Sequence, residues 1–457
     1  MDSTQPYPTP TSDPSTSTTS VQPTFDRFAV TPAFARNLSS SSQHTHPNPP
    51  QSAPLPHRSI PALSNPALLG DLPNTDPLSV LLQKHIPPHL RPVRDLSGTW
   101  NNSSSSSSSS AAAGEEVNEE SVQQAAATNS WRKIACLART QITQSQAASV
   151  EEVLGWWSVR MYALARLRLY SLFRSELDGL WHVLEREGLM EGEEERVPFM
   201  LRVFRATEPK FRGDVRSTVE QYILLIQACK GTMKQAKSKG EGDRAKIWKE
   251  RGLRLGLMLA FTLAEAKDLD GAIEILSPLI QHCLSACESQ DAEESAHLVL
   301  VSTRIYIQAG DLSTAYTLLN RISSLLLRTS PLQGEISHSE SLLAALRGDL
   351  DSASETPPCA SEEKDMSIVE QLNSATVAFY EAKLDKAIST LDKVLEKDPS
   401  RIANSTVAES VVFNLATLYE LGTQGGEQAV VERKRDMVVK VARWIGEAGI
   451  SASCFKL

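Results

Sequence analysis

The sequence predicts an all-α protein, an α-solenoid of helical hairpins that follows a disordered N-terminal arm. Three observations predict it. Proline, serine and threonine dominate the first part of the chain, apolar residues recur at helical spacing from residue 129 onward, and a hairpin pattern repeats towards the C-terminus. The chain has 457 residues, 41% hydrophobic and 22% charged, which suits a globular protein of two or three domains. We expect an arm over 1–128, helical hairpins over 129–244, and a repeat array with capping helices over 245–457.

The arm is proline-rich. Residues 1–98 hold 18 of the 25 prolines, mixed with Ser, Thr, Gln and Asn. Such a segment buries too little apolar surface to offset the entropy lost on ordering, so we expect it to be disordered. Within it, Leu78, Val80, Leu81 and Leu82 form one apolar helical turn between prolines. Two interpretations stay open for this turn: a short motif that folds on a partner, or a chance apolar cluster.

Helical periodicity begins abruptly at residue 129. Between Glu151 and Glu187, Leu154, Trp157 and Met161 share one helical face, which Arg168 interrupts. We interpret the other arginines of this stretch, Arg160, Arg166 and Arg174, as solvated side chains with packed stems rather than as a surface for anionic lipid. Further helices are predicted over 130–142, 197–209, 217–237, 409–421 and 431–447, with a loop over 237–243.

The best-defined hairpin begins at Ser367. Ala375 lies on the inner face of its first helix, Ala387 and Leu391 follow on the second, and Pro399 ends it. Small residues let two helix backbones approach where they cross. This is the pattern of a tetratricopeptide repeat. Because one such hairpin cannot bury its apolar face alone, we expect a stack of them.

The alanine that opens the second helix recurs at spacings of 43, 38 and 34 residues, and the last spacing equals the tetratricopeptide period. The alternative is an ordinary helical bundle with chance alanines. The copy at Ala353 is cut short by Pro357 and Pro358, so we expect a loop over 356–364. The predicted repeat signature comprises Ala272, Leu276, Gly310, Ala315, Leu319, Gly348, Ala353, Ala375, Ala387, Leu391 and Pro399.

Residue patterns for catalysis or cofactor binding are missing from the sequence. It has no phosphate-binding GxxxxGK[ST] loop, no GxGxxG and no GxSxG. Cys283 and Cys287 lie one helical turn apart beside His282, but no second pair has the spacing that zinc needs. We therefore predict no enzyme activity, no cofactor and no metal.

The net charge and the distribution of cysteines limit the partners and the cellular compartment that we expect. The net charge of −9 argues against bulk binding to nucleic acid or to an anionic membrane. The six cysteines are scattered and no secretory signal precedes them, so we expect reduced thiols in the cytoplasm. No stretch has the length of a transmembrane segment.

Several segments resemble, in the same order, the subunit-twelve family of the transport protein particle (TRAPP) complex. The C-terminal segments ESVVFNLATLYEL and CFKL are the more specific ones. The segments are Ser130–Arg139, Val197–Arg202, Ile247–Phe261, Ile307–Ala315, Leu391–Pro399, Glu409–Leu421 and Cys454–Leu457.

The resemblance implies a scaffold subunit of a TRAPP III-type complex, which tethers vesicles and activates a Rab GTPase in endoplasmic reticulum to Golgi transport and autophagy. In that family the nucleotide-exchange site belongs to other subunits. The implied partners are other TRAPP subunits, with an indirect link to the Rab and none to nucleic acid. The implied location is the cytoplasm, at early Golgi and ER–Golgi intermediate membranes, with at most peripheral membrane association through the complex.

Two other functions stay open. A peptide-binding tetratricopeptide adaptor or cochaperone would line a concave groove with Lys and Arg. At the matching point of the best repeat, however, Thr376 stands where such clamps carry an asparagine. A helical enzyme would need convergent polar groups in a closed pocket, and the sequence offers no such set.

Overall fold

The computed structural model describes residues 60–73, 77–91, 122–123, 125–126, 130–144, 149–189, 196–286, 292–325, 332–355, 368–397, 402, 407–422, 426–445 and 451–457. Within these ranges every regular element is a helix. The α-helices are α3 (Pro77–His85), α5 (Trp131–Gln144), α6 (Val150–Arg166), α7 (Tyr170–Arg186), α8 (Phe199–Phe211), α9 (Val215–Ser238), α10 (Gly242–Glu265), α11 (Leu269–Ala286), α12 (Ala292–Ala309), α13 (Leu312–Leu325), α14 (Gln333–Leu346), α15 (Leu350–Glu355), α16 (Ile368–Tyr380), α17 (Leu384–Lys397), α19 (Ala408–Leu421) and α20 (Gly426–Ile445). The 3₁₀ helices are η1 (Pro61–Ser64), η2 (Pro66–Leu68), η3 (Pro88–Leu90) and η5 (Ala452–Phe455).

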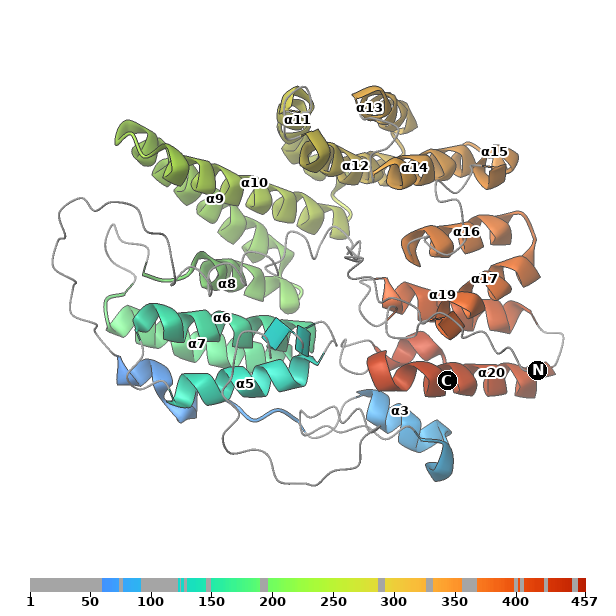
Figure 1. The fold of residues 1–457 in the computed structure, drawn as a ribbon, viewed down its shortest axis with the longest axis horizontal. Helices are drawn as coiled ribbons and strands as arrows, with labels where there is room; N and C mark the ends of the chain where they lie inside the picture. The colour runs from blue at the N-terminus through green and yellow to red at the C-terminus, as the bar shows by residue number, and fades with distance from the viewer. Residues whose placement is uncertain are drawn as a thin grey trace, which may run out of the picture.

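The helices form a solenoid. Consecutive helices pack against one another along the chain. Figure 1 shows them as an arch, with α5–α10 on one side, α11–α15 across the top and α16–α20 on the other side. The predicted all-α solenoid is therefore confirmed.

One turn geometry recurs at seven of the helix-to-helix connections that the structure describes. The first helix ends in a residue with positive φ, and the next N–H donates to the carbonyl five residues back, as Asp311 N does to Tyr306 O at 3.0 Å. This is the Schellman closure of a helix C-terminus. The positive-φ residues of these turns are Arg168, Gly213, Gly240, Lys267, Gly310, Gly348 and Ala382.

Five residues after each of these positions, a side chain is buried in the second helix. Four of these buried residues are the signature alanines Ala272, Ala315, Ala353 and Ala387. In the remaining turns the position holds Phe173, Thr218 or Ala245. The signature alanines therefore mark only part of the repeat: the same turn precedes Phe173 and Thr218, where there is no alanine, and Ala245, which the predicted signature did not include.

Aspartate begins the second helix in four of these turns. One carboxylate oxygen of Asp214, Asp268, Asp311 or Asp349 accepts the N–H three residues later at 3.0–3.1 Å. These are N-caps, which satisfy a helix N–H that has no partner within the helix. Hydrogen bonds donated to the carboxylate hold the pKa of Asp311 below its usual value.

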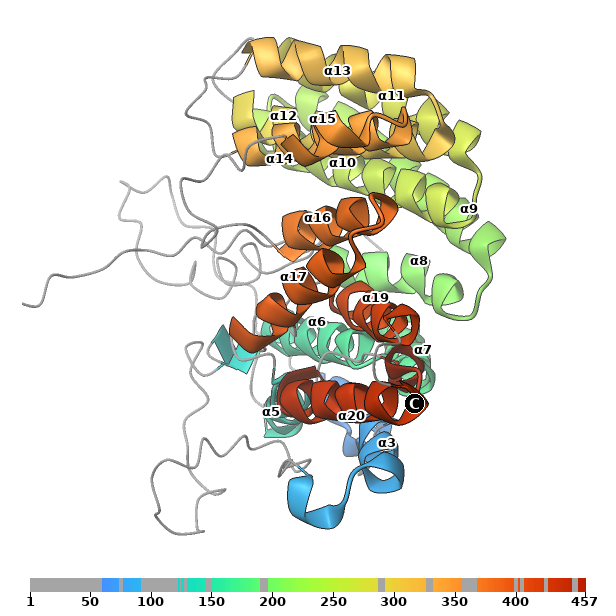
Figure 2. The ribbon, with the colours of Figure 1, turned by 90° about the vertical axis from the view of Figure 1, so that its right-hand side faces the viewer.

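Part of the predicted disordered arm is folded. Residues 60–73 lie on α5, α6 and α7 and bury Leu63 and Leu69. After residues 74–76, α3 buries Leu78, Leu81 and Leu82 against α20 and η5. The expectation of disorder is wrong for these residues. The apolar turn between prolines is a helix, and it docks on the C-terminal end of the same chain (Figure 2).

We define residues 60–73 and 77–91 as the strap. It contacts the first helices of the solenoid with one half and the last helix with the other, so it joins the two feet of the arch. Arg91 closes the strap's own helix, because its Nε donates to Ile86 O at 2.7 Å and its guanidinium to Gln83 O at 2.9 Å. Such bonds satisfy carbonyls at a helix C-terminus.

A buried ion pair anchors the first half of the strap. Arg160 and Glu176 are 0% and 1% exposed and form two hydrogen bonds, 2.7 and 3.1 Å long. Both also bind Gly70: its N–H donates to Glu176 at 2.9 Å, and its carbonyl accepts from Arg160 at 2.8 Å. Arg160 further donates to Ala135 O at 2.9 Å. The interpretation of Arg160 as solvated is therefore wrong, since a buried charge needs partners on every side.

Gly70 allows this close approach. A Cβ built at this position would sit 2.3 Å from Leu172 Cδ1, so a larger residue would displace the leucine. Further hydrogen bonds hold the strap nearby: Trp157 Nε1 donates to Leu63 O at 3.0 Å, and Arg132 donates to Pro73 O.

The interface between α14 and α16 is polar. The buried apolar clusters end at Leu343 on one side and resume at Ile368 on the other. Between them Asn373 donates from its amide to His338 Nε2. Burial lowers the pKa of His338 to about 4, and Arg304 adds to the effect while Glu335 opposes it. A neutral imidazole is required here, because an amide N–H can only donate and needs an unprotonated ring nitrogen.

The signature proline and the expected loop after α15 lie outside the described residues. Pro399 follows α17 by two residues, and the predicted loop over 356–364 follows α15 directly. The predicted loop over 237–243 is shorter than expected, since α9 continues to Ser238 and α10 begins at Gly242.

Replacing Glu176 tests the buried pair. Glu176→Gln leaves the Arg160 charge buried without a counter-charge, so the free energy of unfolding should fall by about 3–5 kcal/mol. Urea unfolding followed by circular dichroism measures this, and hydrogen exchange should show faster exchange at Gly70. The control is Asp178→Asn on the same helix, whose exposed pairs with Arg174 and Arg205 each contribute less than about 1 kcal/mol. Equal losses from the two variants would contradict this role of the pair.

Substituting glycine for alanine, and alanine for glycine, at equivalent turn positions tests the repeat. Ala382 (φ 61°) and Gly310 (φ 82°) occupy the same turn position. The left-handed conformation costs a non-glycine residue about 1–2 kcal/mol, and glycine adds about 0.4–1 kcal/mol of unfolded-state entropy. Ala382→Gly should therefore raise stability by about 1 kcal/mol and Gly310→Ala should lower it by a similar amount. Denaturant midpoints measure both, and shifts of the same sign would refute the equivalence of the turns.

Acid should weaken the α14–α16 interface through His338. The folded pKa of about 4 lies below the ordinary value of 6.5, so this contribution to stability is complete above pH 6.5 and is lost as the pH falls towards 4. Between pH 7 and pH 4 the wild type should lose about 3 kcal/mol more than His338→Gln, which does not titrate. Urea unfolding at both pH values gives the difference. Parallel losses in the two proteins would rule out His338 as the titrating group.

Candidate functional site

The predicted signature residues belong to the interior of the solenoid. The side chains of Ala272, Leu276, Ala315, Leu319, Ala353, Ala375, Ala387 and Leu391 are buried, at 6% exposure or less. Gly310 and Gly348 form positive-φ turns. These residues hold hairpins together and present nothing to a ligand. A functional site has to lie on the surface or in a cavity.

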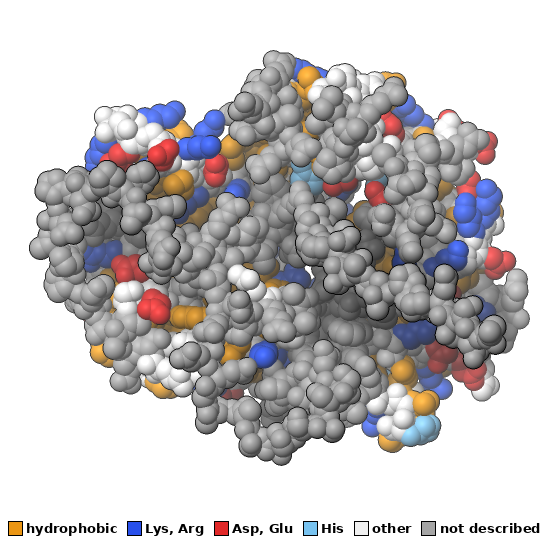
Figure 3. Space-filling view, viewed as in Figure 1, with side chains coloured by type: hydrophobic (Ala, Val, Ile, Leu, Met, Phe, Trp, Pro, Cys, Tyr) orange, Lys and Arg blue, Asp and Glu red, His pale blue; other side chains and the backbone are white. Residues whose placement is uncertain are grey.

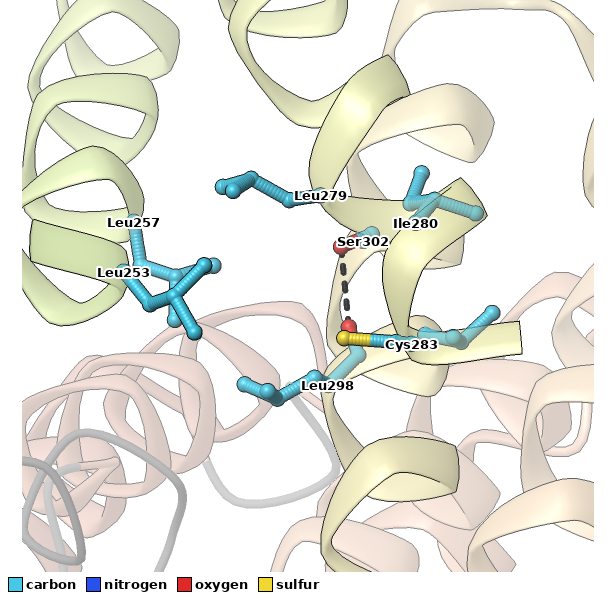
Figure 4. A pocket seen from close by; sticks show the side chains of 8 residues that line it. Leu253, Leu257, Leu279, Ile280, Cys283, Leu298 and Ser302 are labelled. Carbon is cyan, nitrogen blue, oxygen red and sulfur yellow. Dashed lines mark hydrogen bonds between the residues drawn. The ribbon is translucent and has the colours of Figure 1, made fainter. Parts of the chain in front are cut away.

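One apolar pocket lies between α10, α11 and α12 (Figure 4). Leu253, Leu257, Leu279 and Leu298 line it, and Cys283 closes one side. The Ser302 hydroxyl donates to Leu298 O at 2.8 Å, so its proton is already used within α12. The pocket encloses about 10 Å³, about the volume of a single water molecule. Small-molecule sites measure hundreds of Å³, so this pocket is a packing gap.

Chemistry-bearing side chains do not converge in the described part of the chain. No group of three or more His, Cys, Asp or Glu residues there is placed to hold a metal ion. Cys283 is buried on α11, whereas Cys287 lies outside the described residues. None of the described helices is long and apolar enough to cross a bilayer.

The C-terminal tail lies along one face of α19. Ser451 N–H donates to Glu409 at 2.9 Å, and Phe455, which is part of the tail, is fully buried in the C-terminal apolar cluster. Lys434 donates to Glu420 at 2.6 Å and to Lys456 O at 2.9 Å. The fold thus brings Glu409–Leu421 and Cys454–Leu457, the two segments with the more specific family resemblance, into direct contact.

Glu409 also joins the two sides of the arch. Arg168, in the positive-φ turn between α6 and α7, donates to its carboxylate at 2.8 Å. Burial alone would raise the pKa of Glu409, but the hydrogen bonds from Arg168 and from Ser451 N–H outweigh it and hold the pKa below its usual value. Arg168 interrupts the predicted apolar stripe because α6 has already ended there.

Exposed apolar side chains occur on α16 and on α19, two helices that both pack against α17. We define Phe379, Tyr380, Phe413 and Leu421 as the C-terminal apolar surface; their exposed fractions run from 40% to 69%. Leu421 is next to Gly422, whose Cβ position lies 3.0 Å from Ile388 Cδ1 of α17, so the two helix ends are close. Exposed aromatic residues are characteristic of protein–protein interfaces.

A cation lies over one ring of this surface. Lys456 Nζ is 4.7 Å from the centre of the Phe413 ring and 3.1 Å from Glu420. The tail therefore orders the edge of the C-terminal apolar surface. The residue pattern missed Phe379, Tyr380 and Phe413 because helical periodicity marks buried positions, whereas these are apolar residues at solvent-facing positions.

The hairpin of α16 and α17 does not show the polar clamp that a peptide-binding adaptor would need around Thr376. The Thr376 hydroxyl donates to Leu372 O of its own helix at 2.9 Å. Its neighbours on the exposed face are the aromatic residues Phe379 and Tyr380. A peptide carboxylate needs cationic or amide donors, and the amide of Asn373, three residues before Thr376 on this helix, is engaged with His338.

Comparison with known proteins leaves the family open. No protein-family model matches the chain, and no curated protein matches it in sequence. The candidate site is therefore defined by the structure alone, as a surface of exposed apolar residues on α16 and α19 bordered by the C-terminal tail.

Proposed function

We propose that the chain is a non-catalytic scaffold subunit of a TRAPP III-type vesicle-tethering and Rab-activating complex, acting in endoplasmic reticulum to Golgi transport and autophagy. The observation that carries the proposal is the contact between α19 and the C-terminal tail. The two segments with the more specific family resemblance form one surface there, and that surface exposes apolar residues.

The architecture supports a scaffold role. A solenoid offers long helical surfaces, and stable subunit interfaces bury about 1,600 Å² or more in total. The C-terminal apolar surface supplies aromatic anchors for such an interface, and Lys456 and Glu420 supply its polar border. In this proposal the nucleotide-exchange chemistry belongs to other subunits, and the chain reaches early Golgi membranes as part of the complex.

Affinity purification of the tagged chain from its own cells, followed by mass spectrometry, tests the proposal. The wild type should recover small core TRAPP subunits together with Rab exchange activity. Phe413→Asp places a charge in the proposed interface and should reduce that recovery at least tenfold, since truncating an aromatic anchor of an interface costs about 2 kcal/mol or more.

The matched control is Tyr316→Asp on α13. Tyr316 is 47% exposed and lies under Arg347 at 4.8 Å, much as Phe413 lies under Lys456. It should bind as the wild type does. Recovery of chaperones or cargo without any core subunit would refute the scaffold and favour the adaptor. Equal loss in both variants would refute the assigned surface.

A further inference from the structure

The hairpin of α9 and α10 is strongly basic. Residues 228–254 hold nine Lys and Arg against three Asp and Glu, although the whole chain carries a net charge of −9. Figure 1 shows the far end of this hairpin projecting from the arch. Figure 3 shows Lys and Arg side chains gathered over that end, interspersed with acidic ones. Positive charge is therefore concentrated on one projecting element.

Five lysines at this end are available to a partner. Lys230, Lys234 and Lys237 follow one another at four- and three-residue spacing, so they share one face of α9. Lys246 and Lys249 stand on the first turns of α10, across the tight turn at Gly240. All five are exposed, and none forms an ion pair with a residue that the structure describes. We define these five residues as the lysine tip.

The arginines of the hairpin are engaged elsewhere. The Arg251 guanidinium lies 4.6 Å from the centre of Trp248 and 4.8 Å from that of Phe199. Arg244 pairs with Glu241 at 3.1 Å. The cations left for a partner are mainly lysines, which act as point charges and lack the bidentate geometry of guanidinium. Such a surface recognises charge density and not a particular group.

We infer that the lysine tip docks directly on an anionic membrane surface. A protein partner would need a complementary interface around a buried anchor, and the tip offers no aromatic side chain and a single exposed isoleucine, Ile247, among its lysines. Single-stranded nucleic acid would need exposed aromatic residues for stacking, and Trp248 is buried. An anionic leaflet needs only several cations at one level, and each Lys near it strengthens binding about fivefold.

The acidic remainder of the chain does not prevent this contact. Electrostatic interactions are screened beyond about 8 Å at physiological ionic strength. The helix from Lys230 to Lys237 is about 10 Å long, which is close to this screening length. When the tip faces the leaflet, the charges that act on the membrane are therefore those of the tip. The contact is independent of the proposed membership of a TRAPP complex.

Vesicle flotation of the purified full chain tests the inference. The wild type should float with phosphatidylcholine vesicles that contain phosphatidylserine, should not float with pure phosphatidylcholine, and should be released by high salt. The variant Lys234→Glu/Lys237→Glu/Lys246→Glu should bind at least tenfold more weakly. Lys and Glu have similar helix propensities, so the hairpin should fold in both proteins.

A second triple variant controls for total charge. Arg321→Glu/Lys386→Glu/Arg435→Glu changes the net charge equally at exposed sites on α13, α17 and α20 and should float as the wild type does. Equal loss in both variants would overturn the inference, as would flotation that does not depend on phosphatidylserine. Binding to polyglutamate without binding to vesicles would also overturn it and would assign the tip to an acidic protein.

Discussion

The arch depends on one buried ion pair. Arg160 and Glu176 lie on neighbouring helices, and between them they bind both the N–H and the carbonyl of Gly70. A paired charge without water around it needs every donor and acceptor satisfied, so the pair selects one position for the strap. The strap in turn places α3 against α20 and η5. A contact in the first bundle of helices therefore determines what covers the last one.

This dependence matters because the arch is weakly joined elsewhere. Between α14 and α16 the apolar core gives way to the His338–Asn373 contact, and α15 has only six residues. Across the opening, the partly exposed pair of Arg168 and Glu409 adds a contact that solvent weakens. The strap supplies the apolar contact that these polar junctions lack. The relative position of the two sides of the arch is then set by a segment from outside the repeat.

Two surfaces of different chemistry remain at separate places on the arch. The C-terminal apolar surface and the lysine tip lie on opposite sides of the arch (Figure 1). The first exposes aromatic residues and suits a protein partner, whereas the second exposes lysines and suits an anionic leaflet. The stack of hairpins between them, together with the strap, sets their separation. The chain is in this respect suited to hold a protein assembly at a membrane.

The sequence by itself determined the local structure. Helical periodicity, the alanines at 272, 315 and 387, and the glycines at 310 and 348 predicted the hairpins, because helix crossing and chain reversal depend on residues close together in the chain. It missed the turns at Arg168 and Gly213, where the same backbone geometry occurs without an alanine.

Only the tertiary structure decided that Arg160 is buried, that the strap docks on the solenoid, and which side chains form the candidate surfaces. Arg160 and Gly70 are ninety residues apart. The apolar turn of α3 is visible in the sequence, but no local pattern says whether it docks or what it docks on. Likewise, Phe413 and Lys237 become candidate contact residues only because the fold leaves their side chains exposed. Burial and charge pairing are properties of contacts between distant segments, and they exist only once the chain has folded.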